Sequence, residues 1–202
     1  MNTVKKSVSQ LKREAIIEAA KKMFKEQGVA STSMDKLAEV AQVSKRTVYN
    51  HFATKEALVM YLLGEFWLEA ISFNQGVYDP DQDLLIQLRE IILTEIGVIN
   101  SVEHIDMARL IIGHLFYSCE QMSQEIEKMK QHETATLRWI KAAQADGRIT
   151  VKDVQHANQQ MMHLIKGQAF WPQIMACDPL LTEDEKRHLA HETAKMFLSR
   201  YQ

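Results

Sequence analysis

The stretch TSMDKLAEVAQVSKRTVYNHFATKEAL, residues 32–58, contains two short helical patterns that meet at a tight turn. Over Met34–Ala41, apolar residues recur at the i, i+3, i+4 spacing of an amphipathic helix, and Thr32 or Ser33 is available to cap its start. A second pattern covers Lys45–His51. Helices this short are not stable alone, so the stretch predicts a helix-turn-helix unit that decides the fold of this part of the chain.

The second pattern carries the side chains that a DNA-reading helix needs. Ser44 is placed to cap its start, and Val48 and Phe52 are expected to face inward. A helix in the major groove of B-DNA needs donors for phosphate oxygens and short or planar polar groups for base edges. Lys55, at the start of the next helix, is a further candidate phosphate contact. A short basic helix in any small helical domain has a similar composition, so that alternative stays open on this pattern alone. The outward-facing candidates are Lys45, Arg46, Thr47, Tyr49, Asn50 and His51.

The segment resembles the TetR family of bacterial transcriptional regulators over roughly residues 1–65. That family has a glycine after a long first helix, a Thr/Ser start to the second, an A-x-V-S turn, a Y-x-x-F recognition helix and a K-E-x-L start to the fourth. One departure is Gln42, where the family usually has glycine and where a positive φ would cost on the order of 1 kcal/mol. The matching elements here are Gly28, Thr32-Ser33-Met34, Ala41-Gln42-Val43-Ser44, Tyr49-Asn50-His51-Phe52 and Lys55-Glu56-Ala57-Leu58.

The resemblance implies that the second short helix binds double-stranded DNA, with most of its polar side chains along the groove. It also implies that Ser33, Tyr49 and Lys55 clamp phosphates, whereas which residues read a base stays open. The candidate DNA-binding residues are Thr32, Ser33, Ser44, Lys45, Arg46, Thr47, Tyr49, Asn50, His51 and Lys55.

Composition and charge favour an all-α protein with one basic end. Among 202 residues there are only seven glycines and three prolines, and 46% are hydrophobic, so few residues interrupt helices. Residues 1–60 hold 11 Lys+Arg against 6 Asp+Glu, a net charge of +5, whereas residues 61–202 hold 13 against 20, a net charge of −7. A basic end attracts the DNA polyanion by counterion release, and an acidic body does not.

No pattern indicates a metal, cofactor or catalytic site. Cys119 and Cys177 have no Cys or His neighbour at a metal-ligand spacing, and the eight histidines are scattered. Glu133, Asp146 and His114 form no recognisable acid/base arrangement. The sequence also has no signal-peptide run and no stretch near the roughly 20 apolar residues of a membrane span. We therefore expect a cytoplasmic protein that is not an enzyme and that has no cofactor and no membrane partner.

Two domains are expected: a DNA-binding domain at residues 1–53 and, by the resemblance, a ligand-binding and dimerisation domain at residues 54–202. Gly28 should end the first helix. Val8 and Leu11 of that helix are expected to face inward. The fourth helix, residues 54–73, would connect the domains as a lever. Three of the helix starts have sequence signals: Asp79-Pro80 and the capping boxes Thr150 to Asp153 and Thr182 to Glu185. Pro172 predicts a kink or an end. About nine helices are expected, over residues 7–27, 34–41, 45–51, 54–73, 79–100, 102–118, 120–145, 150–171 and 182–201.

The ending of the chain, Gly167 followed by Phe170-Trp171-Pro172, is similar to the AefR-like type of C-terminal domain. A pocket for an unidentified small-molecule effector is expected where large apolar and a few polar side chains converge, and ordinary core packing is the alternative for each residue. The pocket candidates are Phe66, Trp67, Met107, Ile111, His114, Trp139, Ile140 and Gln168. The dimer-interface candidates, on the last two long helices, are Met161, Met162, Ile165, Leu189, Met196 and Phe197.

The leading hypothesis is a ligand-responsive repressor, a homodimer that binds a palindromic operator and is released by a hydrophobic or aromatic effector. An architectural, nucleoid-associated protein of the same fold, controlled by a protein partner, is the alternative. An enzyme in the helical body has no support in the sequence.

Overall fold

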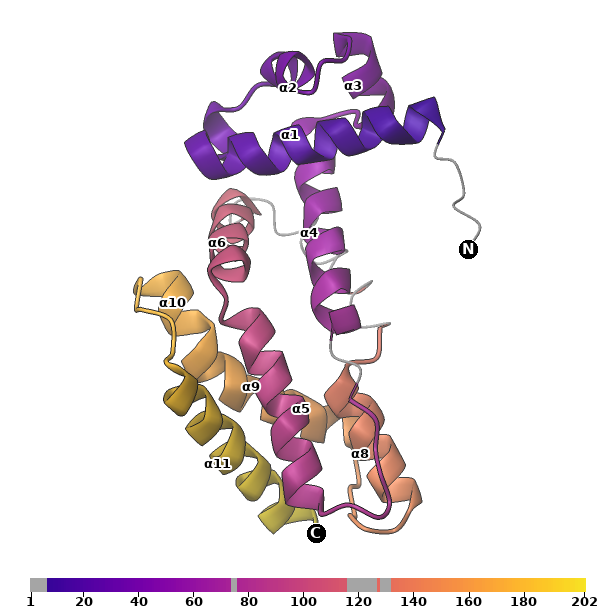
Figure 1. Ribbon diagram of the computed structural model, residues 1–202, viewed down its shortest axis with the longest axis vertical. Coiled ribbons are helices and arrows are strands. Elements are labelled where there is room, and N and C mark those ends of the chain that lie inside the picture. Colours follow the sequence, from indigo (N-terminus) through magenta and orange to yellow (C-terminus); the bar gives the residue numbers. More distant parts are fainter. Residues whose placement is uncertain (1–6, 74–75, 116–126, 128–131) are drawn as a thin grey trace. The chain divides into compact units, whose positions relative to one another are not determined.

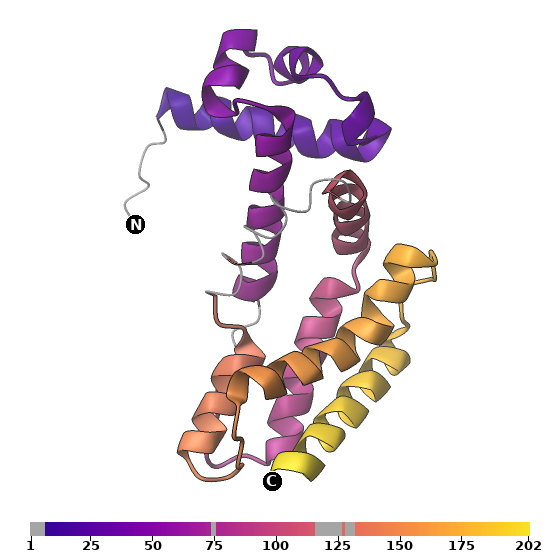
Figure 2. The same cartoon turned by 180° about the vertical axis from the view of Figure 1, so that it is seen from behind.

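The computed structural model describes all residues except 1–6, 74–75, 116–126 and 128–131, and every regular element in the described part is a helix (Figures 1 and 2). The predicted all-α fold class is confirmed. No described helix is long and apolar enough to cross a membrane. The helices are α1 Val8–Ser31, α2 Met34–Val40, α3 Lys45–His51, α4 Lys55–Phe73, α5 Leu84–Ile99, α6 Val102–Leu115, α8 Ala135–Ala145, α9 Val154–Ala169, α10 Trp171–Met175 and α11 Glu183–Tyr201.

By internal packing the chain divides into two compact units. The N-terminal unit runs through Phe66 and includes α6 from Asp106 onward, and the C-terminal unit comprises residues 67–105 and 127–202. The division therefore falls inside α4 and inside α6. It differs from the functional boundary expected after residue 53, and that boundary stays a prediction.

The core of the N-terminal unit is built from apolar side chains of the first four helices. Phe24, Leu37, Val48 and Leu58, one from each helix, are at most 1% exposed. The predicted inward orientation of Val8 and Leu11 was wrong, since they are 69% and 52% exposed. Buried residues of α1 begin only at Ile16, so the first two turns of this helix extend beyond the core.

Gly28 interrupts α1 as the sequence predicts. Its φ of 79° and ψ of 161° lie outside the helical region, in a conformation that side chains with a Cβ rarely adopt. A further helical turn follows through Ser31, so the helix ends later than expected. After this last turn, only Thr32 separates α1 from Ser33, the N-cap of α2.

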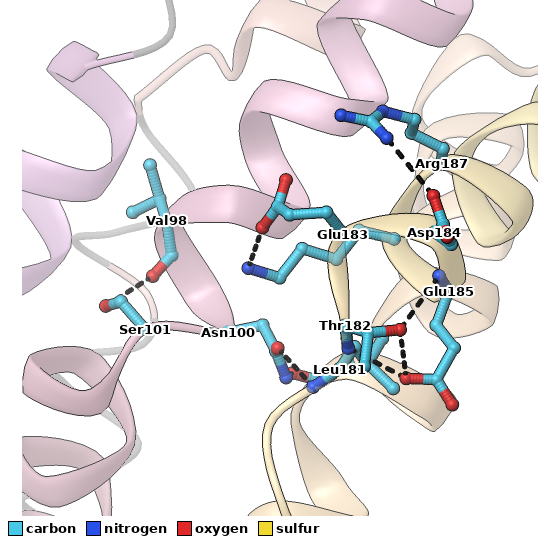
Figure 3. A network of polar contacts seen from close by, with 11 residues as sticks. Val98, Asn100, Ser101, Leu181, Thr182, Glu183, Asp184, Glu185 and Arg187 are labelled. Atoms are coloured by element: carbon cyan, nitrogen blue, oxygen red, sulfur yellow. Dashed lines mark hydrogen bonds and ion pairs between the residues drawn. The ribbon is translucent and has the colours of Figure 1, made fainter.

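The C-terminal unit is organised around α5, which lies beside α11 in both views of the ribbon (Figures 1 and 2). At the end of α5, Asn100 is fully buried and holds two other segments (Figure 3). Its Nδ2 donates to the carbonyl of Ala169 at 2.8 Å, and its Oδ1 accepts from the Leu181 amide at 2.9 Å. Directly after Leu181, the predicted capping box of Thr182 and Glu185 opens α11 and is confirmed (Figure 3).

Two predicted helix starts in this unit were wrong, because another residue provides the cap. Asp83, rather than Asp79, caps α5, and Asp153, rather than Thr150, caps α9. The continuous helix expected over residues 120–145 is also wrong, since residues 132–134 are not helical and Thr134 caps α8. The start expected at residue 120 lies outside the described residues. Pro172 acts as predicted: α9 ends at Ala169, and the short α10 has the proline in its first turn.

Candidate nucleic-acid interface

Both short helices of the helix-turn-helix begin at serine caps. The Ser33 hydroxyl accepts a hydrogen bond from the Lys36 amide, and the Ser44 hydroxyl accepts one from the Thr47 amide, each at 3.1 Å. Each cap satisfies an amide that the first turn of a helix leaves without an intrahelical partner. The prediction for Ser44 is confirmed, and of the two candidates at the start of α2, Ser33 is the cap.

A Schellman motif ends α2 and forms the turn between the two helices. The Val43 amide donates to the Ala38 carbonyl at 3.0 Å, and the Gln42 amide donates to the Glu39 carbonyl at 3.1 Å. This pair of bonds requires a left-handed residue at its centre. Gln42 has a φ of 54°, so the strained conformation considered from the sequence is present.

Gln42→Gly should therefore stabilise the protein by about 0.5–1 kcal/mol, because glycine adopts a positive φ without a steric penalty. The end of α8 shows the same pair of bonds with Gly147 at the central position, where φ is 74°. The measurement is thermal denaturation, with Gly147→Gln as the reverse control, expected to lower the melting temperature. A lower melting temperature for Gln42→Gly would contradict the strain argument.

The recognition helix α3 is anchored by one face and exposed on the other. Val48 is fully buried and Phe52, its C-cap, is 4% exposed, which confirms their predicted inward orientation. Thr47 and His51 are half-buried. The exposed side chains of the helix are Lys45, Arg46, Tyr49 and Asn50.

The two cations at the start of α3 differ in their surroundings. Lys45 Nζ lies 2.5 Å from Asp35 Oδ2, and this hydrogen bond and charge raise the pKa of Lys45. A phosphate would have to compete with the Asp35 carboxylate for that ammonium. Arg46 forms no ion pair with any residue in the described part of the chain, so its guanidinium is available for a phosphate or a base edge.

Thr32 is not available to DNA, contrary to the sequence prediction. Its side chain is 1% exposed. The hydroxyl donates to the Gly28 carbonyl at 2.9 Å and accepts from Gln27 Nε2 at 3.2 Å. Thr32 therefore closes the end of α1.

Lys55 is also occupied by the protein itself. Its ammonium contacts the backbone carbonyls of Val29, Ala30 and Thr32 at 2.8, 3.3 and 3.0 Å. Sequence reasoning placed Lys55 correctly at the start of α4 but missed these partners, which lie 23 to 26 positions away. A DNA phosphate would have to compete with these three carbonyls for the Lys55 ammonium.

Two family models match the chain. The model described as bacterial regulatory proteins, tetR family, matches residues 16–62, and the one described as AefR-like transcriptional repressor, C-terminal domain, matches residues 86–202. A solved structure of a TetR family transcriptional regulator from Pseudomonas syringae pv. tomato str. DC3000 is 36% identical, with a TM-score of 0.77 over 94% of this chain and 96% of that chain. The chain belongs to the TetR family of transcriptional regulators.

Curated TetR-type relatives align over shorter stretches. The HTH-type transcriptional regulator AcrR of Shigella flexneri is 32% identical over 57% of this chain and 53% of its own length. The HTH-type transcriptional regulator TtgR of Pseudomonas putida is 31% identical over 65% of this chain and 62% of its own. The chain thus spans little more than half the length of these relatives. Both resemblances drawn from the sequence, TetR and AefR-like, are confirmed, and the family consists of transcriptional regulators rather than enzymes.

The candidate residues of the predicted effector pocket lie in both units of this TetR-family chain, and the pocket stays a prediction. Trp139 and Ile140 are fully buried core residues of the C-terminal unit, whereas Gln168 is exposed. Phe66 and Met107, both half-buried, belong to the N-terminal unit. The side chains of three further candidates lie outside the described part of the structure: Trp67, Ile111 and His114.

The predicted dimer-interface residues divide into two groups. Met196 is 56% exposed and Met162 is half-buried, so both are accessible to a second chain. The other four are filled by contacts within one chain and are at most 6% exposed, so their assignment to the interface was wrong: Met161, Ile165, Leu189 and Phe197. Leu164 on α9, 39% exposed, was not among the candidates.

Three charged or titratable groups in the C-terminal unit were missed by sequence reasoning. Glu95 is 8% exposed. Burial lowers the pKa of Lys166, and the charge of Glu95 partly opposes that shift. Burial and the charge of Lys166 lower the pKa of His104 to about 4, so this histidine is neutral near pH 7. Lys166 stands four positions after Met162 and four before Phe170. Residues four apart share one face of a helix, so this spacing places Lys166 on the same face as two apolar residues.

Proposed function

We propose that the protein is a homodimeric transcriptional repressor that places α3 in the major groove of a palindromic operator and is released by a small hydrophobic or aromatic effector. The observation that carries the DNA-binding role is the exposed polar face of α3, held by the buried Val48 and Phe52. Residues 1–53 would act as the DNA-binding domain and residues 54–202 as the ligand-binding and dimerisation domain. Two-fold symmetry would present two recognition helices to half-sites about one helical turn apart, roughly 34 Å.

The revised interface consists of side chains that the structure leaves accessible. Arg46 and Lys45 supply cations, and Tyr49 and Asn50 supply hydrogen-bonding groups toward phosphates and base edges. The residues that flank this face in the proposal are Ser33, Ser44, Thr47 and His51.

Arg46→Ala should weaken operator binding and flatten its salt dependence. The slope of log K against log salt should fall in magnitude by about 0.9 for each protomer, because one phosphate charge is no longer neutralised. The measurement is fluorescence anisotropy over a salt series, with an operator duplex selected from a random DNA library on the wild-type protein. Lys152→Ala is the matched control, since Lys152 is exposed before α9 and should leave the slope unchanged. Equal slopes for Arg46→Ala and wild type would exclude this docking mode.

The family comparisons favour a repressor over an architectural protein, since the C-terminal model is described as a transcriptional repressor domain. Mapping of bound sites across the genome separates the two. A few promoter sites support the repressor, and many dispersed sites support the architectural alternative.

A further inference from the structure

Backbone carbonyls gather at the junction of α1 and α2, because Gly28 interrupts α1 shortly before its end. The Thr32 hydroxyl satisfies the Gly28 carbonyl. The Lys55 ammonium lies within hydrogen-bonding distance of three more carbonyl oxygens: Val29 at 2.8 Å, Ala30 at 3.3 Å and Thr32 at 3.0 Å. Carbonyls at a helix C-terminus lack intrahelical partners and carry negative partial charge, which favours a cation.

The donor count of Lys55 leaves nothing for DNA. A lysine ammonium has three N–H donors and no acceptor. Three carbonyls occupy those three donors in this structure. Binding a phosphate would therefore require breaking at least one bond that closes the α1–α2 junction. Because the partners precede Lys55 by 23 to 26 positions, these bonds tie the first turn of α4 to the segment that leads into α2.

A second contact holds α4 two turns further along. The Arg13 guanidinium of α1 lies 4.0 Å from the ring centroid of Tyr61 and 5.2 Å from that of Phe52. The rings of Tyr61 and Phe52 have centroids 5.5 Å apart. Phe52 is the C-cap of α3, so this cluster joins α1, α4 and the end of the recognition helix. Cation–π contacts of this kind are attractive and directional.

We propose that Lys55 is a positioning residue, which fixes the start of α4 on the α1–α2 junction and so orients the exposed face of α3, and that it does not contact a DNA phosphate. The proposal rests on the proposed function, because it assigns a role within the same DNA-binding unit. With the Arg13 cluster as the second fixed point, the first two turns of α4 move with the helix-turn-helix as one body.

Two substitutions distinguish positioning from phosphate binding. Lys55→Met keeps an unbranched side chain but removes all three donors. Lys55→Arg keeps the positive charge, but a planar guanidinium cannot direct three donors at carbonyls that converge on one atom. Both full-length variants are titrated with the library-selected operator duplex over a salt series, at a temperature where circular dichroism shows them folded. Arg46→Met is the matched control for a true loss of a phosphate contact.

The expected result is that both Lys55 variants bind about tenfold more weakly or worse, with the wild-type salt slope, whereas Arg46→Met lowers the slope by about 0.9 per protomer. A salt slope lowered by Lys55→Met and restored by Lys55→Arg would overturn the proposal in favour of a phosphate contact. Wild-type affinity in folded Lys55→Met would overturn it in favour of a purely structural role. An unchanged slope for Arg46→Met counts instead against the proposed interface, so the two failures are distinguishable.

Discussion

Replacing Trp139 with alanine should lower the free energy of unfolding by about 3–5 kcal/mol, because it opens a large cavity in the core of the C-terminal unit. The Trp139 side chain is 0% exposed, and its indole N–H donates to Gln87 Oε1 at 2.9 Å. The Tyr78 ring packs edge-on against it, with centroids 6.0 Å apart. Alanine would also remove a hydrogen-bond donor from Gln87, whose side chain is buried. Urea denaturation followed by far-ultraviolet circular dichroism measures the loss.

Trp171→Ala is the matched control, since the same side chain is removed from a position that is 47% exposed. Its contact with the Phe170 ring is partly solvated, so the expected loss is under about 1 kcal/mol. If Trp139→Ala unfolded like the wild type and lost only its response to an effector, Trp139 would line a pocket as the sequence suggested.

The pocket prediction shows a limit of helical periodicity. The spacing of apolar residues indicates which face of a helix turns inward, and Trp139 and Ile140 do lie inside. Periodicity carries no information on whether the space they face is hollow or filled. In α8 the space around Trp139 is filled by Gln87 and Tyr78, which come from segments more than 50 positions away.

Features that depend on near neighbours in the sequence were predictable. The cap at Ser44, the capping box of Thr182 and Glu185 and the helix break before Pro172 involve groups within a few positions of one another. The positive φ at Gln42 followed from the position of a turn that glycine usually fills. In each case the hydrogen-bonding partners are set by local chain geometry.

Features that depend on distant partners were not predictable in the same way. Asp79 and Asp83 are both good helix caps, and the choice between them is made by Gln87, whose Nε2 donates to the carbonyls of Asp79 and Gln82 and holds the segment as a turn. Lys55 and Arg46 are both cations in the helix-turn-helix region, so the sequence predicted a DNA contact for each. The carbonyls that the Lys55 ammonium contacts come from residues 23 to 26 positions earlier, and only the three-dimensional structure reveals them.

The proposed dimer depends on which apolar side chains α9 and α11 leave uncovered. Leu164 on α9 is 39% exposed and Met196 on α11 is 56% exposed. Buried neighbours such as Ile165 and Phe197 hold the two helices within the C-terminal unit and have no surface left for a second chain. In a two-fold symmetric dimer each exposed residue is buried twice. The interface should therefore be sensitive to charge at these two positions.

The double variant Leu164→Glu, Met196→Glu should be monomeric and bind the operator at least about a hundredfold more weakly, because the two recognition helices are no longer linked. Losing about 1 kcal/mol of apolar burial at each of four symmetry-related positions weakens the dimer roughly a thousandfold, and the buried carboxylates add to this loss. Sedimentation velocity measures the assembly and anisotropy measures DNA binding.

Val77→Glu is the control, since Val77 is 82% exposed before α5 and its substitution should leave a dimer with wild-type affinity. Because all three positions are solvent-exposed in a single chain, each variant should remain folded. A double variant that still sediments as a dimer would show that the subunits associate through another face.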